Sequence, residues 1–206
     1  MRGRALTDGD IHRVRAALVA EATALLEAEG RDAVSLRQVA ARAGMSRSTP
    51  YTYFADKDAL LDAVRAAAID ALTDAAEAAL AQQSTVEARL AALGAAYVGF
   101  ALSRPALYAL IFEGPGGGQA SPSEAPEEVQ AAAARYRVLA QIPLREAEER
   151  GLLTVAPERL SDVLWASTHG VIQLHRAGKL RRPLHEVLKD MGDILAFGFA
   201  RHKEAT

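Results

Sequence analysis

Apolar residues recur every three or four positions along most of the chain, the spacing of one face of an α-helix. The chain is also rich in alanine and leucine and poor in aromatic residues, which favours packed helices over sheets. We therefore expect an all-α protein of about nine helices. The periodic segments place them near residues 10–29, 36–43, 47–54, 56–82, 85–103, 107–112, 126–150, 157–176 and 184–202.

The stretch Ser35–Phe54 predicts two short helices joined by a tight turn. Ser35 and Gln38 have the spacing of a capping box, which opens the first helix. Gly44 suits the left-handed residue that ends a helix, and Ser46 can cap the next one. Two helices joined by a glycine-containing turn of three or four residues are typical of a helix-turn-helix.

The second helix of this pair is unusually polar at its start. Arg47, Ser48 and Thr49 all have side chains that hydrogen-bond bases or phosphates. Pro50 falls at the fourth helical position and removes one backbone bond, so we expect an irregular or tight start. A plain helical hairpin is the alternative, but exposed tyrosines such as Tyr51 have little use there. In a helix-turn-helix, such a helix lies in the major groove of DNA.

The run from Ile11 to Val64 resembles the DNA-binding domain of TetR/AcrR-type transcriptional regulators. The residues that carry the resemblance are SLRQVAARAGMSRSTPYTYF followed by ADKDALLDAV, about fifty residues with the preceding helix. Two positions depart from the commonest form: Pro50 stands where leucine is usual, and Thr52 where a basic or polar residue is common. Both departures affect which bases are read.

The predicted DNA contacts divide by role. Arg47, Ser48 and Thr49 are candidates for base readout, and Tyr51, Tyr53 and Lys57 for phosphate contacts. Thr52 is ambiguous, and Arg37 is added as a further basic group of the interface. A lysine on the first turn of a helix is disfavoured by the helix dipole, and a nearby phosphate would explain Lys57 there. A solvated lysine is the alternative.

The charge distribution fits this assignment once it is divided along the chain. The net charge is −2, but residues 1–65 carry ten Lys/Arg and nine Asp/Glu, while residues 35–57 carry four basic residues and one acid. Affinity for DNA depends on local charge at the phosphates rather than on the total. An N-terminal arm with Arg2 and Arg4 either enters the minor groove or is a tail with incidental arginines.

Residues 66–206 change to long alanine-rich helices without basic clustering, so we expect two domains, 1–65 and 66–206. A glycine- and proline-rich segment, 114–126, predicts a flexible loop inside the second. It lacks the Gly-Lys-Ser/Thr ending and the preceding strand of a phosphate-binding loop.

The last two predicted helices favour self-association. Both carry an apolar face and interior glycines such as Gly170 and Gly192, which suit close approach of helices. Two such helices doubled by a two-fold axis form a four-helix bundle, the dimer interface that the family resemblance implies. A purely intramolecular core is the alternative.

A small-molecule effector is the third expected partner, after operator DNA and a second copy of the chain. Trp165, His169 and Gly170 resemble the C-terminal domain of a subgroup of these regulators marked by a Trp-His-Gly motif. Pockets of this kind pair apolar walls with a few polar groups. The candidate lining residues are Tyr97, Phe100, Tyr108, Phe112, Tyr136, Trp165 and His169.

The sequence allows several roles for His169. It either donates to a bound effector or satisfies a buried carbonyl group. Together with His175, Glu186 or Asp190 it could be argued as a metal site, but the spacing matches no familiar ligand pattern. We expect no metal and no cofactor.

Several classes are excluded by what the sequence lacks. It has no cysteine, no G-x-S-x-G and no H-E-x-x-H, so we expect no enzyme. It has no obvious membrane span or signal peptide, so we expect a cytoplasmic protein. The sequence predicts a homodimeric repressor released from a palindromic operator by a small apolar or aromatic molecule. A ligand-independent or activating regulator and a helical adaptor are the alternatives.

Overall fold

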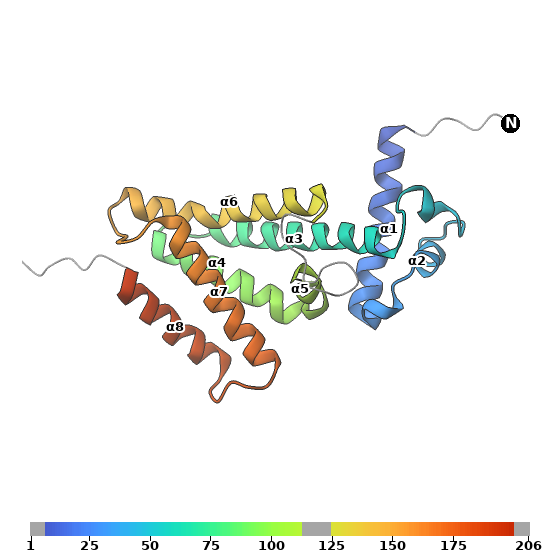
Figure 1. Ribbon diagram of the computed structural model, residues 1–206. Helices are drawn as coiled ribbons and strands as arrows, with labels where there is room; N and C mark the ends of the chain where they lie inside the picture. Colours follow the sequence, from blue (N-terminus) through green and yellow to red (C-terminus); the bar gives the residue numbers. More distant parts are fainter. Residues whose placement is uncertain (1–6, 113–124, 200–206) are drawn as a thin grey trace, which may run out of the picture. The chain divides into compact units, whose positions relative to one another are not determined.

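The computed structural model describes residues 7–112 and 125–199, which are helical with no strand element among them (Figure 1). The α-helices are α1 (Asp8–Glu29), α2 (Leu36–Arg42), α3 (Lys57–Ala81), α4 (Val86–Ser103), α5 (Pro105–Phe112), α6 (Glu127–Glu149), α7 (Pro157–Arg176) and α8 (Leu184–Phe199). Two 3₁₀ turns, η1 (Arg31–Ala33) and η2 (Thr49–Thr52), lie between them. The predicted all-α class is confirmed.

The described residues hold eight α-helices rather than nine, and the difference lies at one place. The helix expected at residues 47–54 is the short 3₁₀ turn η2. The N-terminal arm at Arg2 and Arg4, almost all of the loop predicted at 114–126, and the end of the last predicted helix at His202 lie outside the described residues.

Local capping signals set most helix boundaries. The hydroxyl of Ser35 accepts the backbone N–H of Gln38 at 3.2 Å, which caps α2 as predicted. Pro105 opens α5 directly after α4, and Pro157 opens α7, since the missing N–H has no partner to lose in a first turn. Pro143 lies inside α6, which runs on through it as one helix, with Pro143 in its buried face.

The chain divides into two compact units. Unit 1 comprises residues 1–71 and 103–134, and unit 2 comprises residues 72–102 and 135–206. Unit 1 thus joins the N-terminal helices to α5 and the start of α6. The domain boundary expected at residue 65 stays a prediction.

Unit 1 has a fully closed core. Apolar side chains that are at most 2 % exposed come from α1, α2 and α3, among them Leu18, Leu25, Val39, Leu60 and Val64. The removal of this apolar surface from water is the main source of the unit's stability. The core fixes the positions of α1, α2 and the first turns of α3, on which the candidate site is built.

Two ion pairs tie α1 to the later segments of unit 1. The guanidinium of Arg104 donates to both carboxylate oxygens of Glu27, at 2.8 and 2.9 Å. Arg15 donates to Glu128 on α6 at 2.5 Å, and its guanidinium lies 5.1 Å from the ring centre of Phe54. The middle of α1 is therefore held by α6, and its C-terminal end by the residue that precedes α5, as well as by the core.

In unit 2, α7 and α8 pack side by side (Figure 1). The apolar face predicted for α7 is only partly correct. Leu160 and Ile172 are buried, whereas Val163 and Leu174 are 38 % and 49 % exposed. Periodicity identifies an apolar stripe, but it does not say whether the same chain covers that stripe.

One helix, α4, is long and apolar enough to cross a membrane by length and composition alone, which the sequence analysis did not anticipate. Several of its side chains are nevertheless buried inside the protein, including Val86, Tyr97 and Phe100.

Candidate functional site

The turn after α2 closes as a Schellman motif. Gly44 adopts φ +66°, a conformation that glycine reaches without steric cost. The N–H of Met45 donates to the carbonyl of Ala40 at 2.9 Å, and the N–H of Gly44 donates to that of Ala41 at 3.2 Å. This arrangement stops α2 and fixes the direction in which the next residues leave it.

The following segment winds as a 3₁₀ turn because of Pro50. The N–H of Thr49 donates to the carbonyl of Ser46 at 3.1 Å, and the N–H of Tyr51 donates to that of Ser48 at 3.2 Å. Both are bonds to the third preceding residue, which define the 3₁₀ form. The tight start predicted from Pro50 is confirmed, and it extends over the whole element.

Burial divides the turn into an inner and an outer side. Pro50 is fully buried and Phe54 is 3 % exposed, so these two side chains anchor the turn in the core. Arg47, Ser48 and Thr52 are exposed, and Thr49 and Tyr53 are partly buried. Tyr51 is 61 % exposed, which is unusual for a large aromatic side chain.

The hydroxyl groups at the start of the turn bond to one another. The Oγ of Ser46 lies 3.1 Å from the Oγ of Ser48 and 2.7 Å from the Oγ1 of Thr49. Ser46 was expected to cap an α-helix through the backbone, and in the structure it instead orders the two neighbouring side chains. This network presents Ser48 and Thr49 in a fixed arrangement.

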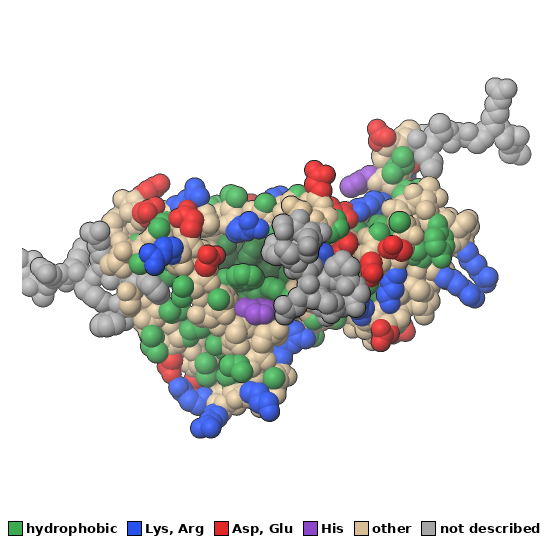
Figure 2. Space-filling view, viewed as in Figure 1, with side chains coloured by type: hydrophobic (Ala, Val, Ile, Leu, Met, Phe, Trp, Pro, Cys, Tyr) green, Lys and Arg blue, Asp and Glu red, His purple; other side chains and the backbone are tan. Residues whose placement is uncertain are grey.

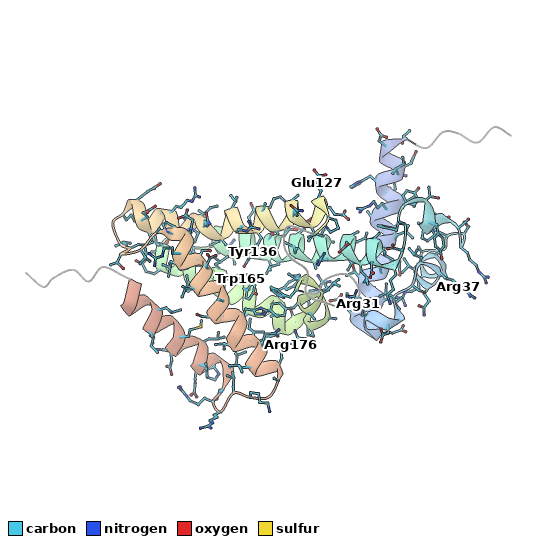
Figure 3. All side chains as sticks on the ribbon, viewed as in Figure 1. Arg31, Arg37, Glu127, Tyr136, Trp165 and Arg176 are labelled. Carbon is cyan, nitrogen blue, oxygen red and sulfur yellow. The ribbon has the colours of Figure 1, made fainter. Side chains whose placement is uncertain are left out.

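The basic residues near the turn have different surroundings. Arg37 is exposed on the first turn of α2 (Figure 3), and Arg47 is exposed just before η2. Arg42, in contrast, pairs with Glu21 at 3.2 Å. Figure 2 shows Lys and Arg side chains projecting from the surface near α2. Arg37 and Arg47 are therefore the better-placed cations for a phosphate or a base.

Lys57 lies in a more enclosed position than the sequence suggested. Its ammonium group donates to the backbone carbonyl of Arg31 at 2.8 Å, which links the start of α3 to η1. Asp58 pairs with the Arg31 guanidinium at 3.4 Å. An ammonium group has three N–H donors, so the bond to Arg31 leaves capacity for a phosphate oxygen.

Four of the predicted effector-contacting residues form an aromatic cluster in unit 2. The indole N–H of Trp165 donates to the hydroxyl of Tyr97 at 3.2 Å, and that hydroxyl lies 3.4 Å from Nδ1 of His169. The ring of Tyr136 lies 6.5 Å from that of Tyr97. Figure 3 labels Tyr136 and Trp165 on α6 and α7.

The protonation of this cluster follows from its surroundings. Burial lowers the pKa of the His169 imidazole below its usual value of 6.5, and the charge of Arg176 lowers it further. The ring is therefore neutral at pH 7, and its Nδ1 can accept the hydroxyl hydrogen of Tyr97. Trp165, Tyr97 and His169 then form one consistent donor–acceptor chain.

Three further predicted effector contacts are divided between the two units. Phe100 is 6 % exposed on α4 in unit 2. Tyr108 and Phe112 form a ring pair on α5 in unit 1, with centroids 5.2 Å apart. The seven residues therefore do not form one cluster within either unit.

The alternative metal site has its acidic groups already engaged. Arg182 donates to Glu186 at 3.1 Å and to Asp190 at 2.6 Å. Over residues 7–112 and 125–199, no group of three or more His, Asp or Glu side chains has an arrangement that could hold a metal ion. Glu186 and Asp190 instead form ion pairs with Arg182 near the start of α8.

Sequence reasoning missed the long-range ties around the site. Arg15 and Glu128 are 113 positions apart, and Glu27 and Arg104 are 77 apart. No motif or periodicity links residues at such separations. The bond from Lys57 to the Arg31 carbonyl was missed for the same reason.

Two family profiles cover most of the chain. Residues 18–64 match the profile described as bacterial regulatory proteins, tetR family, and residues 90–193 match that of the tetracyclin repressor-like C-terminal domain. The chain belongs to the TetR family. Its helix-turn-helix is therefore that of a DNA-binding transcriptional regulator, and the protein is not an enzyme. The narrower Trp-His-Gly subgroup stays a prediction.

Solved structures extend this assignment. A Rhodococcus sp. RHA1 protein of unknown function shares 34 % identity, with coverage of 91 % of this chain and 96 % of that one and a TM-score of 0.78. A TetR-family transcription regulator from Marinobacter aquaeolei VT8 shares 20 % identity, with coverage of 95 % and 100 % and a TM-score of 0.66. The fatty acid degradation regulator FadR from Bacillus halodurans shares 17 %, with coverage of 89 % and 95 % and a TM-score of 0.68.

The last two structures show the shared fold alone, because their identity to this chain is low. None of the curated proteins is detectably similar in sequence. Members of the TetR family are soluble DNA-binding proteins, so α4 is not a membrane span.

Proposed function

We propose that this TetR-family protein is a cytoplasmic homodimeric repressor that leaves a palindromic operator when a small apolar or aromatic molecule binds its C-terminal helices. The observation that carries the proposal is the turn Arg47–Thr52, whose polar and aromatic side chains face solvent while Pro50 and Phe54 anchor it in the core. A surface built in this way is suited to the major groove.

The contacts with DNA follow from exposure and chemistry. Arg47, Ser48 and Thr49 read bases, because their side chains hydrogen-bond base edges. Arg37, Tyr53 and Lys57 contact phosphates and set the register of the turn on the duplex. Thr52 and Tyr51 are exposed beside them and belong to the same interface.

Self-association is supported by the apolar side chains that α7 and α8 leave exposed. Val163, Leu174 and Ile194 are 38 %, 49 % and 70 % exposed. Figure 2 shows hydrophobic side chains among the surface atoms of this helix pair. A two-fold axis beside α7 and α8 would form a four-helix bundle and bury these groups.

The effector is proposed to bind beside the cluster of Tyr97, Trp165 and His169. Neutral aromatic rings with a few hydrogen-bonding groups suit an uncharged, largely apolar molecule with one or two polar atoms. A partly buried, neutral histidine does not favour a cationic ligand, because it supplies no negative charge to pair with it. Phe100 on α4 extends the apolar wall.

The link between ligand and DNA is proposed to run through α3. This helix contributes residues 57–71 to unit 1 and residues 72–81 to unit 2 without a break. A ligand that prefers one tilt of α3 would change the separation of the two reading turns. Half-sites are about 34–36 Å apart, so a shift of a few ångströms removes the fit. A coupling of about 1–3 kcal/mol is typical of such a link.

The first test is selection of bound sequences from random duplexes by the purified protein at moderate salt. We expect a palindromic consensus, and a complex with two protein chains by native mass measurement. Small aromatic and aliphatic molecules would then be screened for release of the selected duplex.

Other outcomes would redirect the proposal. A consensus without symmetry would contradict the dimeric binding mode. A selected duplex that no compound releases, or binds only with a compound present, would favour a ligand-independent or activating regulator. Failure to enrich any sequence would favour the helical adaptor.

A further inference from the structure

Pro50 has a covalent effect on the reading turn that reaches beyond packing. In an α-helix that begins after Ser46, the residue at position 50 donates its N–H to the Ser46 carbonyl. Proline has no N–H, and in the structure that carbonyl accepts from Thr49 instead, at 3.1 Å. The same closure repeats at Tyr51, whose N–H donates to Ser48.

The two helix forms place Ser48 and Tyr51 differently. In an α-helix, residues three apart are separated by about 300° around the axis, so their side chains point about 60° apart. In a 3₁₀ helix they eclipse, and the rise of about 2.0 Å per residue sets them about 6 Å apart along the axis. Both side chains are exposed, and the N–H of Tyr51 donates to the Ser48 carbonyl in a 3₁₀-type bond, so this geometry would place them on one outward edge of the turn.

A separation of about 6 Å has a counterpart in DNA. Successive base pairs are about 3.4 Å apart along the helix, so two steps cover about 6.8 Å. With the axis of the turn along the direction in which the base pairs stack, an edge that carries Ser48 and Tyr51 would match base pairs two steps apart. The α-helical spacing for three residues, about 4.5 Å, falls between one step and two.

The position of Tyr51 also suits bases rather than phosphates. Its ring is 61 % exposed, and Ser48, which the 3₁₀ geometry would place on the same edge, lies 3.1 Å from the hydroxyl of Ser46. Apolar ring atoms pack against the thymine methyl in the major groove, and the phenol adds a donor and acceptor.

We propose that Pro50, which is buried and cannot itself contact DNA, makes Tyr51 a base-reading residue by enforcing the 3₁₀ turn. Tyr51 then reads a thymine two base pairs from the pair that Ser48 reads. Pro50 is a positioning residue for operator specificity. This inference rests on the proposed reading role of Ser48, and it moves Tyr51 from the phosphate contacts predicted from sequence to the base contacts.

The direct test compares Ser48→Ala and Tyr51→Ala in the same selection from random duplexes. Both side chains are exposed, so both variants keep the core intact. We expect each to lose preference at one base pair of each half-site, by at least about fivefold, and the two base pairs to be two steps apart. Replacing the thymine read by Tyr51 with deoxyuridine should weaken the native protein and leave Tyr51→Ala unaffected.

The role of Pro50 is tested with Pro50→Ala, which restores the missing N–H. We expect sensitivity to the thymine methyl to disappear while affinity for random DNA at low salt stays the same. Val39→Ala is the matched control, because it removes buried apolar volume from α2 but leaves the turn's backbone unchanged. It should lower thermal stability and keep the native base preference.

Several results would overturn the inference. Tyr51→Ala could weaken binding to every sequence equally, which would make Tyr51 a phosphate contact. The two affected base pairs could be adjacent, or Pro50→Ala could keep the native preference. If the native protein selects no sequence, the proposed operator function fails as well. If Pro50→Ala does not fold, the separation of the base pairs affected by Ser48→Ala and Tyr51→Ala still tests the inference.

Discussion

Unit 1 buries its apolar side chains, whereas the α7–α8 pair of unit 2 leaves many of its apolar side chains exposed. Unit 1 buries Leu18, Leu60 and Val64 completely and presents a polar turn to solvent. On α7 and α8, few side chains are buried, and Leu174 and Ile194 are largely exposed. The first region completes its core within one chain, and its outer surface is free to recognise DNA. The second has an apolar surface that a second copy would cover.

The largest effect should come from the closed core. Leu60→Ala removes a fully buried side chain and should lower the free energy of unfolding by about 2–5 kcal/mol, measured by urea denaturation. Leu174→Ala is the matched control, because its side chain is half exposed and should cost little in the monomer. Equal losses in dilute protein would contradict the contrast between the two regions.

A charged substitution tests whether the apolar surface of α7 and α8 is the dimer interface. Ile194→Glu places a carboxylate where two copies are proposed to meet, and burying it there without a partner should raise the dimer dissociation constant at least about a hundredfold. Sedimentation would then show a folded monomer. Val138→Glu changes a residue of similar exposure, 68 %, on α6 and should leave the dimer intact. Monomers from both variants would point to nonspecific repulsion.

The polar surface of unit 1 is tested at Arg47. Arg47→Ala should reduce discrimination at particular base pairs by about 1–3 kcal/mol each, measured as affinity for single-base variants of the operator. Arg37→Ala, on α2, is the comparison and should weaken all sequences alike. If Arg47→Ala also weakens all sequences alike, Arg47 contacts phosphate.

The smallest effect should come from the ties around α1. The hydrogen bonds from Arg104 lower the pKa of the Glu27 carboxyl below its ordinary 4.5. A lowered pKa means that the pair stabilises the fold above about pH 4.5, and that this contribution is lost as the pH falls through the folded pKa. Because both side chains are about a third exposed, solvent screening limits it to about 1 kcal/mol or less.

Glu27→Gln therefore should lower the free energy of unfolding slightly at pH 7, and the difference from the native protein should shrink at pH 3. Urea denaturation at both pH values measures it. A difference that stays constant with pH would mean that the amide disturbs packing rather than charge.

The parts of this molecule that the sequence predicted are those with local causes. Ser35 caps α2 through a residue three positions away, and Gly44 adopts the left-handed conformation where the helix stops. Pro157 opens α7 at the residue where that helix was expected to begin, for the same kind of reason. Each of these signals is contained within one turn of the chain, so no tertiary contact is needed to read it.

The parts that could not be predicted depend on residues far apart in the sequence, or on local signals and tertiary packing that favour different structures. Pro50 indicated a tight start, but its missing N–H did not say how far the 3₁₀ winding runs, and in the structure it continues to Thr52. Pro143 is unfavourable inside a helix, yet α6 runs on through it, with Leu144 and Ala147 buried nearby. Lys57 indicated a phosphate contact, and its bond to a distant carbonyl followed from no local pattern.

The exposed apolar side chains of α7 and α8 also imply that stability and operator occupancy depend on the protein's concentration. If two copies cover them as proposed, the folded dimer is favoured by mass action, and the melting temperature should rise with protein concentration. Operator occupancy would then follow roughly the square of the chain concentration in the range where monomers predominate. A modest change in the cellular level of this protein would produce a steep change in the expression of its targets.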